Sequence, residues 1–192
     1  MLRGWTSIRP VGKLSQAIAE GDGISILVQA DDVTSAVAAE QQGADGLVAL
    51  AGAGEIRASS QLPLLHLGGL AEASNVAADG VVVPVDLAAW DEGHALGLEC
   101  VVRVSHAQEL ERALEELDPE ILLLSPRPDP ERDLLEELLG LLHDVPAGKL
   151  AIAELQDASA HEVAELERAG VDAVLVAAGD VAALVPVEPP EV

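Results

Sequence analysis

Aromatic side chains are nearly absent from this sequence. Phe and Tyr do not occur, and Trp5 and Trp90 are the two tryptophans among 192 residues. Hydrophobic residues nevertheless make up 49% of the chain, which allows a sizeable core and excludes disorder over most of its length. The core must therefore consist of Leu, Val, Ile and Ala, which are typical of parallel strands covered by helices.

Basic residues are also scarce. The chain has 10 Lys and Arg against 34 Asp and Glu, and its formal net charge is −24. Binding to a nucleic-acid backbone or an anionic membrane surface needs clusters of Lys and Arg. We therefore expect no nucleic-acid or membrane partner, and we interpret the acidic surface as a solvated one that resists aggregation.

Cysteine and long apolar stretches are scarce as well. Cys100 is the single cysteine, so an intramolecular disulfide is excluded, and its apolar surroundings in the sequence predict a small core residue. No apolar run reaches the 18 residues that a membrane-spanning helix needs, and MLRGWTSIRPVGKL at the start lacks the apolar stretch of a signal peptide. We expect a cytoplasmic protein.

Short apolar runs recur along the chain, and segments with helical spacing separate them. Each run has the length and composition of a strand buried on both faces, and the alternation implies parallel pairing through right-handed crossovers. We therefore predict an α/β fold, a compact (β/α)8 TIM barrel, in a single domain at 1–185 with a flexible tail at 186–192. The eight predicted strands lie at 24–29, 45–50, 62–67, 80–85, 98–104, 120–125, 149–154 and 172–177.

An open doubly wound sheet is the alternative fold. Its dinucleotide-binding form is disfavoured because no GxGxxG motif follows the first predicted strand, and we expect no cofactor. Eight strands in 192 residues leave little room, so the helices after the second and third strands, at 55–61 and 70–78, should be short.

Helix-starting residues mark two of the longer helices. Pro130 stands at a suitable first helical position, and Ser159 with Glu162 three residues later forms a capping box. Two similar segments, AVAAEQQGADGLVAL and EVAELERAGVDAVLVA, place Asp45 and Asp172 at equivalent helix-to-strand turns. We expect these two aspartates to have a structural role, on the face of the barrel opposite the usual active site.

Several segments resemble indole-3-glycerol-phosphate synthase and occur in that family's order. The resemblance covers roughly residues 14–180 and is strongest from residue 98 onward. It implies a (β/α)8 barrel of the phosphate-binding superfamily and a carboxy-lyase activity of tryptophan biosynthesis. The segments that carry it are LSQAIAEGDGISILVQ, LPLLHLGGL, LECVVRVSHAQELERAL, LLLSPR and LAIAELQDASAHEVAELERAGVDAVLVA.

Most catalytic residues of that family are replaced in this chain. The Lys of the family's third strand, its expected general acid, corresponds to Leu67, and the Glu of its fifth strand corresponds to Arg103. The dehydration step needs a proton donor and a carboxylate within hydrogen-bond reach. The two lysines of the chain, Lys13 and Lys149, precede the first and seventh strands, so neither should reach the site.

Other positions keep polar residues. Glu154 matches the Glu of the family's seventh-strand motif, and Arg127 matches an Arg after its sixth strand. Ser125 stands in place of an Asn, Gln29 in place of a Lys, and Gly179 in the loop after the eighth strand. The resemblance therefore implies a barrel that keeps a ligand site and loses most of the chemistry.

Barrel enzymes carry their sites at the carboxyl ends of the strands, and the polar residues predicted there define the candidate site. We assign Glu154, Arg103 and His66 as candidate catalytic residues, since a carboxylate and an imidazole can transfer protons. Arginine can bind a carboxylate or a phosphate with two parallel hydrogen bonds. The alternative to a catalytic role is an ion pair between Glu154 and Arg103 that only closes the barrel. The candidate ligand-binding residues are Arg127, Ser125, Gln29 and Gly179.

No metal site is expected, because the spacings of His66, Asp86 and His106 match no ligand motif. The sequence favours a divergent synthase-like barrel that lacks full synthase activity and binds a small anionic ligand, a phosphate or a carboxylate. An active lyase and a non-catalytic protein-interaction barrel remain alternatives, and the sequence leaves the oligomeric state open.

Overall fold

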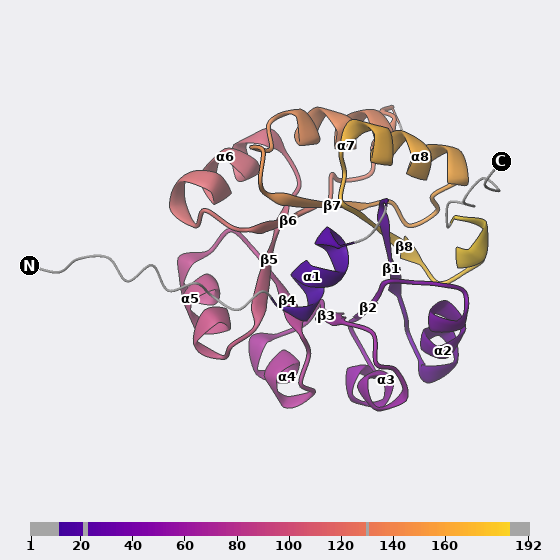
Figure 1. Ribbon diagram of the computed structural model, residues 1–192. Coiled ribbons are helices and arrows are strands. Elements are labelled where there is room, and N and C mark those ends of the chain that lie inside the picture. The colour runs from indigo at the N-terminus through magenta and orange to yellow at the C-terminus, as the bar shows by residue number, and fades with distance from the viewer. Residues whose placement is uncertain (1–11, 21–22, 130, 185–192) are drawn as a thin grey trace, which may run out of the picture.

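Eight parallel strands close into a barrel in the computed structural model, which describes residues 12–20, 23–129 and 131–184. Each strand pairs with its neighbours in chain order, and β8 returns to pair with β1. The predicted (β/α)8 fold is therefore confirmed (Figure 1), whereas the predicted tail at 186–192 lies outside the described residues. The strands are β1 (Ser25–Gln29), β2 (Gly46–Ala49), β3 (Leu64–His66), β4 (Gly80–Val83), β5 (Glu99–Val104), β6 (Ile121–Leu124), β7 (Leu150–Glu154) and β8 (Ala173–Ala177).

Helices α2 to α8 form the outer ring (Figure 1), and their order follows the prediction. The helices after the second and third strands are short, with 7 residues in α3 and 6 in α4. In the described part of the chain, no helix is long and apolar enough to cross a membrane. The helices are α1 (Lys13–Ala19), α2 (Val33–Gln41), α3 (Ala53–Ser59), α4 (Leu70–Asn75), α5 (Leu87–Ala95), α6 (Ala107–Glu116), α7 (Leu134–His143) and α8 (Ala160–Ala169), with a 3-10 turn η1 (Val181–Ala183).

Side-chain caps decide where two of these helices start. The predicted capping box of Ser159 and Glu162 is present at the start of α8. The predicted start at Pro130 is wrong, because α7 begins only at Leu134; Pro130 itself lies outside the described residues. Asp133 accepts hydrogen bonds from the free N–H groups of Leu135 and Glu136 in the first turn of α7, a role that proline cannot take because its side chain has no acceptor.

The buried side chains form two layers, inside and outside the sheet. Because side chains alternate along a strand, every second residue points into the barrel and the others meet the helices. Cys100 is buried in the outer layer, which confirms the prediction of a small core residue. The inner layer is aliphatic and contains Leu27, Val48, Leu65, Val101, Ile121, Leu123, Ile152, Ala173 and Leu175.

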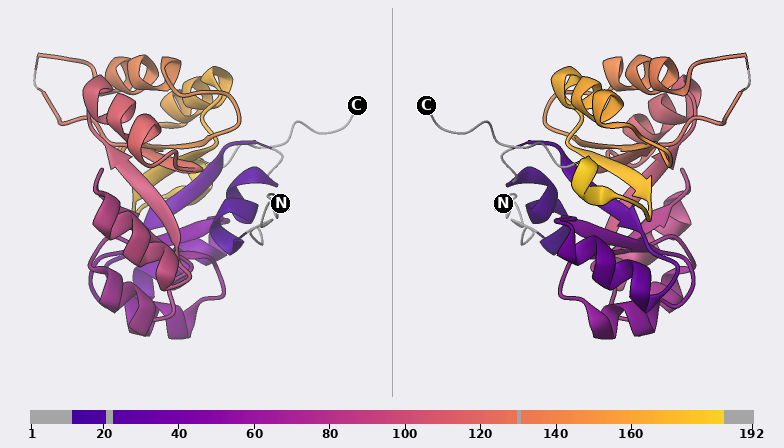
Figure 2. Two further views of the ribbon diagram at one scale, coloured as in Figure 1. Left: turned by 90° about the vertical axis from the view of Figure 1, so that its left-hand side faces the viewer. Right: turned by 90° about the vertical axis from the view of Figure 1, so that its right-hand side faces the viewer.

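Helix α1 closes the barrel at the amino-terminal ends of the strands. It lies across the centre of the strand ring in Figure 1, and the side views of Figure 2 place it at one end. Leu14 and Ile18 of α1 are buried with the inner layer. The carboxylate of Glu99, at the start of β5, accepts hydrogen bonds from the N–H groups of Leu14 at 2.8 Å and Ser15 at 3.0 Å. Glu99 thus satisfies two of the free amides in the first turn of the helix that seals this end.

Three aspartates at helix-to-strand turns repeat one contact at this end of the barrel. Asp45 accepts the N–H of Ile26 in β1 at 2.8 Å, and Asp172 accepts that of Ala151 in β7 at 2.8 Å. The predicted structural role of these two residues is therefore confirmed. Burial raises the pKa of Asp45, and the hydrogen bond from Ile26 opposes that rise. Asp79 is the third of these aspartates and accepts the N–H of Leu64 in β3 at 2.9 Å. The sequence did not single it out.

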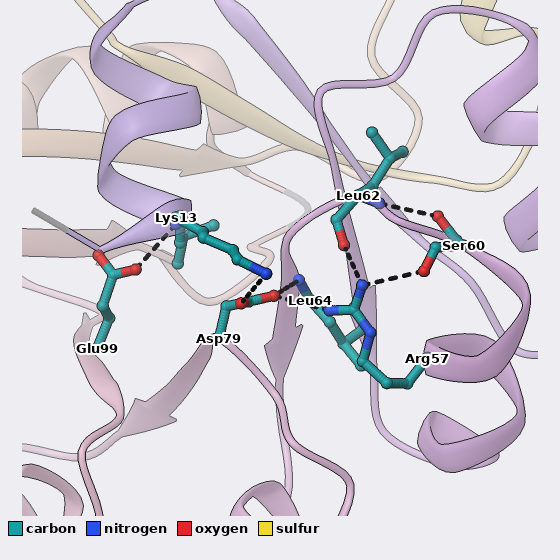
Figure 3. Close-up of polar contacts among 8 residues, drawn as sticks. Lys13, Arg57, Ser60, Leu62, Leu64, Asp79 and Glu99 are labelled. Carbon is teal, nitrogen blue, oxygen red and sulfur yellow. Dashed lines mark hydrogen bonds and ion pairs between the residues drawn. The ribbon is translucent and has the colours of Figure 1, made fainter.

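Asp79 also organises a charged network (Figure 3). Its carboxylate binds the Arg57 guanidinium at 2.8 Å and lies 3.8 Å from the Lys13 ammonium of α1. Arg57 in turn donates to the carbonyls of Ser60 at 3.0 Å and Leu62 at 3.1 Å. The network links α1, α3 and the turns before β3 and β4, so its charges act on stability at the end opposite the candidate site.

Candidate functional site

Gln29, Arg103 and Glu154 point into the barrel at the carboxyl ends of their strands. Gln29 is the last residue of β1, Glu154 is the last of β7, and Arg103 is the last but one of β5. Each lies two residues beyond an inner-layer side chain, so strand alternation puts all three on the inner face. The structure therefore brings together three of the predicted site residues.

A chain of hydrogen bonds joins these residues across the mouth of the barrel. Arg103 Nη2 donates to Glu154 Oε2 at 3.2 Å, so the predicted ion pair between them is present. Gln156 Nε2 donates to Glu154 Oε1 at 3.1 Å and to Gln29 Oε1 at 3.2 Å. We call Gln29, Arg103, Glu154 and Gln156 the mouth network. Gln156 is the member that sequence reasoning missed, although it lies two residues after Glu154.

Arg103 has hydrogen-bonding capacity to spare. Its side chain is 41% exposed, whereas that of Glu154 is 19% exposed. Arg103 Nε is buried and, within the described residues, has no hydrogen-bond partner. A guanidinium carries five N–H donors, and a buried donor without an acceptor is destabilising. An acceptor with two oxygens would satisfy Nε and a terminal nitrogen together.

The wall of the mouth at the third and fourth strands is apolar. Leu67 and Val82 are partly buried and pack against the inner layer. Leu67 directly follows β3 and Val82 lies in β4, so this wall lies across the barrel from Glu154 of β7 and beside Arg103 of β5. Leu67 stands at the position of the lysine that is the expected general acid of the resembled family, so this wall offers no proton donor in its place.

His66 does not join the mouth network. The sequence places it with Arg103 and Glu154, but Leu65 is the residue of β3 that points inward, so His66 faces the helices. His66 is fully buried, its Nδ1 accepts the N–H of Gly68 at 2.8 Å, and its Nε2 lies 3.9 Å from Glu72 of α4. A one-residue change in which side chain points inward accounts for the difference.

The other predicted ligand-binding residues lie apart from one another. Ser125 follows β6 and shares the inward direction of Leu123, so it borders the mouth. Arg127 is exposed in the loop after β6, which projects away from the end that α1 closes (Figure 2). Gly179 is exposed after β8, and the first N–H of the following turn η1, from Val181, donates to Gln42 Oε1 at 2.7 Å. That amide is therefore engaged within the protein.

Asp86 and His106 serve as helix caps. Asp86 accepts the N–H of Ala89 at 2.8 Å at the start of α5, and His106 Nδ1 accepts that of Glu109 at 3.3 Å at the start of α6. Within the described residues, no three His, Cys, Asp or Glu side chains are grouped to hold a metal ion. A surface hollow of about 350 Å³ lies apart from the mouth, on α6 and next to Asp144.

Beside the mouth, Ser105 fixes a carboxylate at the start of α6. The Ser105 hydroxyl donates to Glu109 Oε2 at 2.7 Å and holds the pKa of Glu109 below its usual value. The Ser105 N–H at 2.8 Å and the charges of His106 and Arg127 lower the pKa further, while burial opposes them. Such a group stabilises the fold above its unfolded pKa, and this stability is lost as pH falls through the folded pKa.

We expect Ser105→Ala to raise the pKa of Glu109 toward its ordinary value, because the hydroxyl is the largest cause of its lowering. The variant should lose up to about 1 kcal/mol of stability near neutral pH, and the difference from the wild type should shrink in acid. Carbon-detected NMR titration of the carboxylate checks the first effect, and urea denaturation at two pH values checks the second. Ser74→Ala, on exposed α4, is the matched control; an unchanged Glu109 titration in Ser105→Ala would contradict the assignment.

The chain has known relatives, although no family model matches it. An indole-3-glycerol phosphate synthase from Geobacillus sp. (strain WCH70) is 31% identical over an alignment of 93 residues, and the match covers 45% of this chain. The match spans 34% of that synthase, about a third of its length.

Two solved structures have a similar fold. An N-acetylmannosamine-6-phosphate 2-epimerase from Clostridium perfringens superposes with a TM-score of 0.69 at 18% identity, over 83% of this chain and 88% of the epimerase. A thiamine phosphate pyrophosphorylase from Pyrococcus furiosus superposes with a TM-score of 0.66 at 18% identity, over the same shares of 83% and 88%. At this level of identity the likeness shows the fold alone.

Proposed function

We propose that this protein binds a small anionic metabolite, a phosphate or a carboxylate, at the mouth of the barrel and lacks full synthase activity. The observation that carries the proposal is Arg103, which is partly exposed and keeps a buried Nε without a partner among the described residues. A bidentate anion supplies the two acceptors that this edge of the guanidinium needs. The position also agrees with where barrels of this fold hold their ligands.

The sequence match supports an anionic ligand. The name of the matched synthase contains a phosphate compound, indole-3-glycerol phosphate. The N–H of Val181 at the start of the 3-10 turn after β8 already donates to Gln42. This hydrogen bond favours Arg103 over that turn as the contact for the anion.

The loss of synthase activity follows from the placement of the proton donors. Leu67 occupies the position of the expected general acid. Lys13 lies near Asp79 and Lys149 pairs with Asp118, and both precede strands rather than follow them. A single general acid contributes roughly 10²–10⁴-fold to such a step, so its absence removes most of the rate.

Binding is tested by isothermal titration calorimetry with phosphate sugars and simple carboxylates. We expect binding to the wild type and at least about a tenfold weaker affinity for Arg103→Met, since charge-assisted hydrogen bonds of this kind contribute about 1.5–3 kcal/mol. Arg112→Met, on the exposed side of α6, is the matched control and should bind as the wild type does. Equal affinities for Arg103→Met and wild type would refute the role of Arg103, and a wild type that binds no anion would refute the proposal.

Synthase activity is tested with carboxyphenylaminodeoxyribulose phosphate at high protein concentration, followed by indole fluorescence. We expect no product. Turnover that Glu154→Gln abolishes would instead favour an active lyase of tryptophan biosynthesis, the alternative suggested by the match to the Geobacillus synthase.

A further inference from the structure

The charges of the mouth network balance each other. Arg103 and Glu154 are its two charged members and contact each other at 3.2 Å, while Gln29 and Gln156 are neutral. An anion that takes the donors of Arg103 competes with Glu154 for the same guanidinium. The charge of the ligand therefore affects both Arg103 and Glu154.

A ligand that carries only negative charge would leave the carboxylate of Glu154 without its cationic partner. The Glu154 side chain is 19% exposed, and without Arg103 its remaining hydrogen-bond donor in the network is Gln156 Nε2. Removing one partner from a largely buried ion pair is strongly unfavourable, because the other charge stays desolvated. The net charge of −24 adds repulsion, and the two lysines lie at the other end of the barrel.

We propose that the ligand carries a cationic group close to its anionic group, as an α-amino acid or a short amino-phosphate does. The anionic end binds Arg103, and the ammonium replaces Arg103 as the partner of Glu154. The spacing fits, because the two charges of the protein lie in contact and the two charges of such a ligand are a few bonds apart. This inference rests on the proposed function and specifies the class of its ligand.

The rest of the mouth specifies the uncharged part of the ligand. Leu67 and Val82 form an apolar wall across the barrel from Glu154 and beside Arg103, and no described side chain of the mouth network adds a further charge. Burial of a methylene group against such a wall is favourable. A branched aliphatic amino acid therefore fits the mouth better than a polyhydroxylated or doubly charged ligand.

The test compares ligands that differ only in one charge, by isothermal titration calorimetry on the full chain. L-Leucine carries both charges, 4-methylpentanoate lacks the amine, and isoamylamine lacks the carboxylate. O-Phosphoethanolamine against ethyl phosphate makes the same comparison for a phosphate end. We expect the better of the two zwitterions to bind at least about tenfold more tightly than its matched anion, and the pair that shows this difference identifies the anionic group.

The variant Glu154→Gln separates the charge from the shape of the site. It should reduce or reverse the preference for the zwitterion, since a neutral amide has no need of an ammonium, whereas Glu111→Gln on α6 should leave the preference unchanged. Wild type that binds the plain anions as tightly as the zwitterions would overturn this inference and leave the proposed function standing. A preference that survives in folded Glu154→Gln would also overturn it, and wild type that binds neither class would overturn both proposals.

Discussion

Leu14→Ala should lower the free energy of unfolding by about 2–5 kcal/mol, the range for truncation of a fully buried leucine. Leu14 is 0% exposed and packs from α1 into the inner layer of the barrel. The truncation leaves a cavity beside Gly80, because a Cβ added at Gly80 would lie only 2.9 Å from the Leu14 side chain. Glycine at position 80 leaves no side chain there to fill the space, so the cavity term should be close to its full size.

Urea denaturation followed by far-UV circular dichroism measures this loss. Leu50→Ala is the matched control, since Leu50 directly follows β2 and is 56% exposed, and it should change stability by no more than about 0.5 kcal/mol. If Leu14→Ala were as stable as Leu50→Ala, α1 would not be part of the cooperative barrel. The α1 closure described above would then be wrong.

Asp79→Ala should lower the free energy of unfolding by about 3 kcal/mol. The side chains of Asp79 and Arg57 are 13% and 19% exposed, and removal of one partner from such a pair leaves a desolvated charge. The variant also leaves the N–H of Leu64 without the acceptor it has at 2.9 Å. Three contacts are lost at once, because Lys13 shares the same carboxylate.

A double-mutant cycle with Arg57→Met isolates the ion pair. We expect the double variant to be more stable than the sum of the two single changes predicts, because no unpaired charge remains in it. Asp91→Ala, on the exposed part of α5, should be nearly neutral and serves as the control. Strict additivity of Asp79→Ala and Arg57→Met would mean that the pair does not contribute as a unit.

The fold was predictable because its signal is repeated. Each strand reads as a continuous apolar run, a pattern that follows directly from burial on both faces. The start of α7 was not predictable in the same way, since Pro130 and Asp133 are both good helix-starting residues. The side chain of Asp133 accepts hydrogen bonds from two backbone N–H groups, and α7 begins directly after it.

The site was predictable where strands are long and ambiguous where they are short. Arg103 is the last but one residue of a strand of 6 residues, and Glu154 is the last of a strand of 5, so their direction follows from inner-layer neighbours. β3 has 3 residues, and in LPLLHL an apolar residue stands on either side of His66, so the sequence gives no alternation to decide its direction.

Two other residues show the limit of strand-based reasoning. Gln156 lies beyond the end of β7, and its contact with Gln29 joins positions 127 residues apart, which no local pattern reveals. Arg127 matches an arginine of the resembled family, yet it is exposed and acts on Glu109. A loop residue can keep its identity while the path of the loop sends its charge elsewhere.

The closure of the barrel by α1 has a kinetic consequence. Leu14 and Ile18 fill the amino-terminal end of the barrel axis, so a molecule held by Arg103 has to depart along the route by which it arrived. Association and dissociation then use the same opening of the barrel. A bulky compound bound at that opening would slow both rates without altering their ratio. In the part of the chain that the structure describes, these two side chains and the aliphatic inner layer leave no passage for a ligand straight through the barrel.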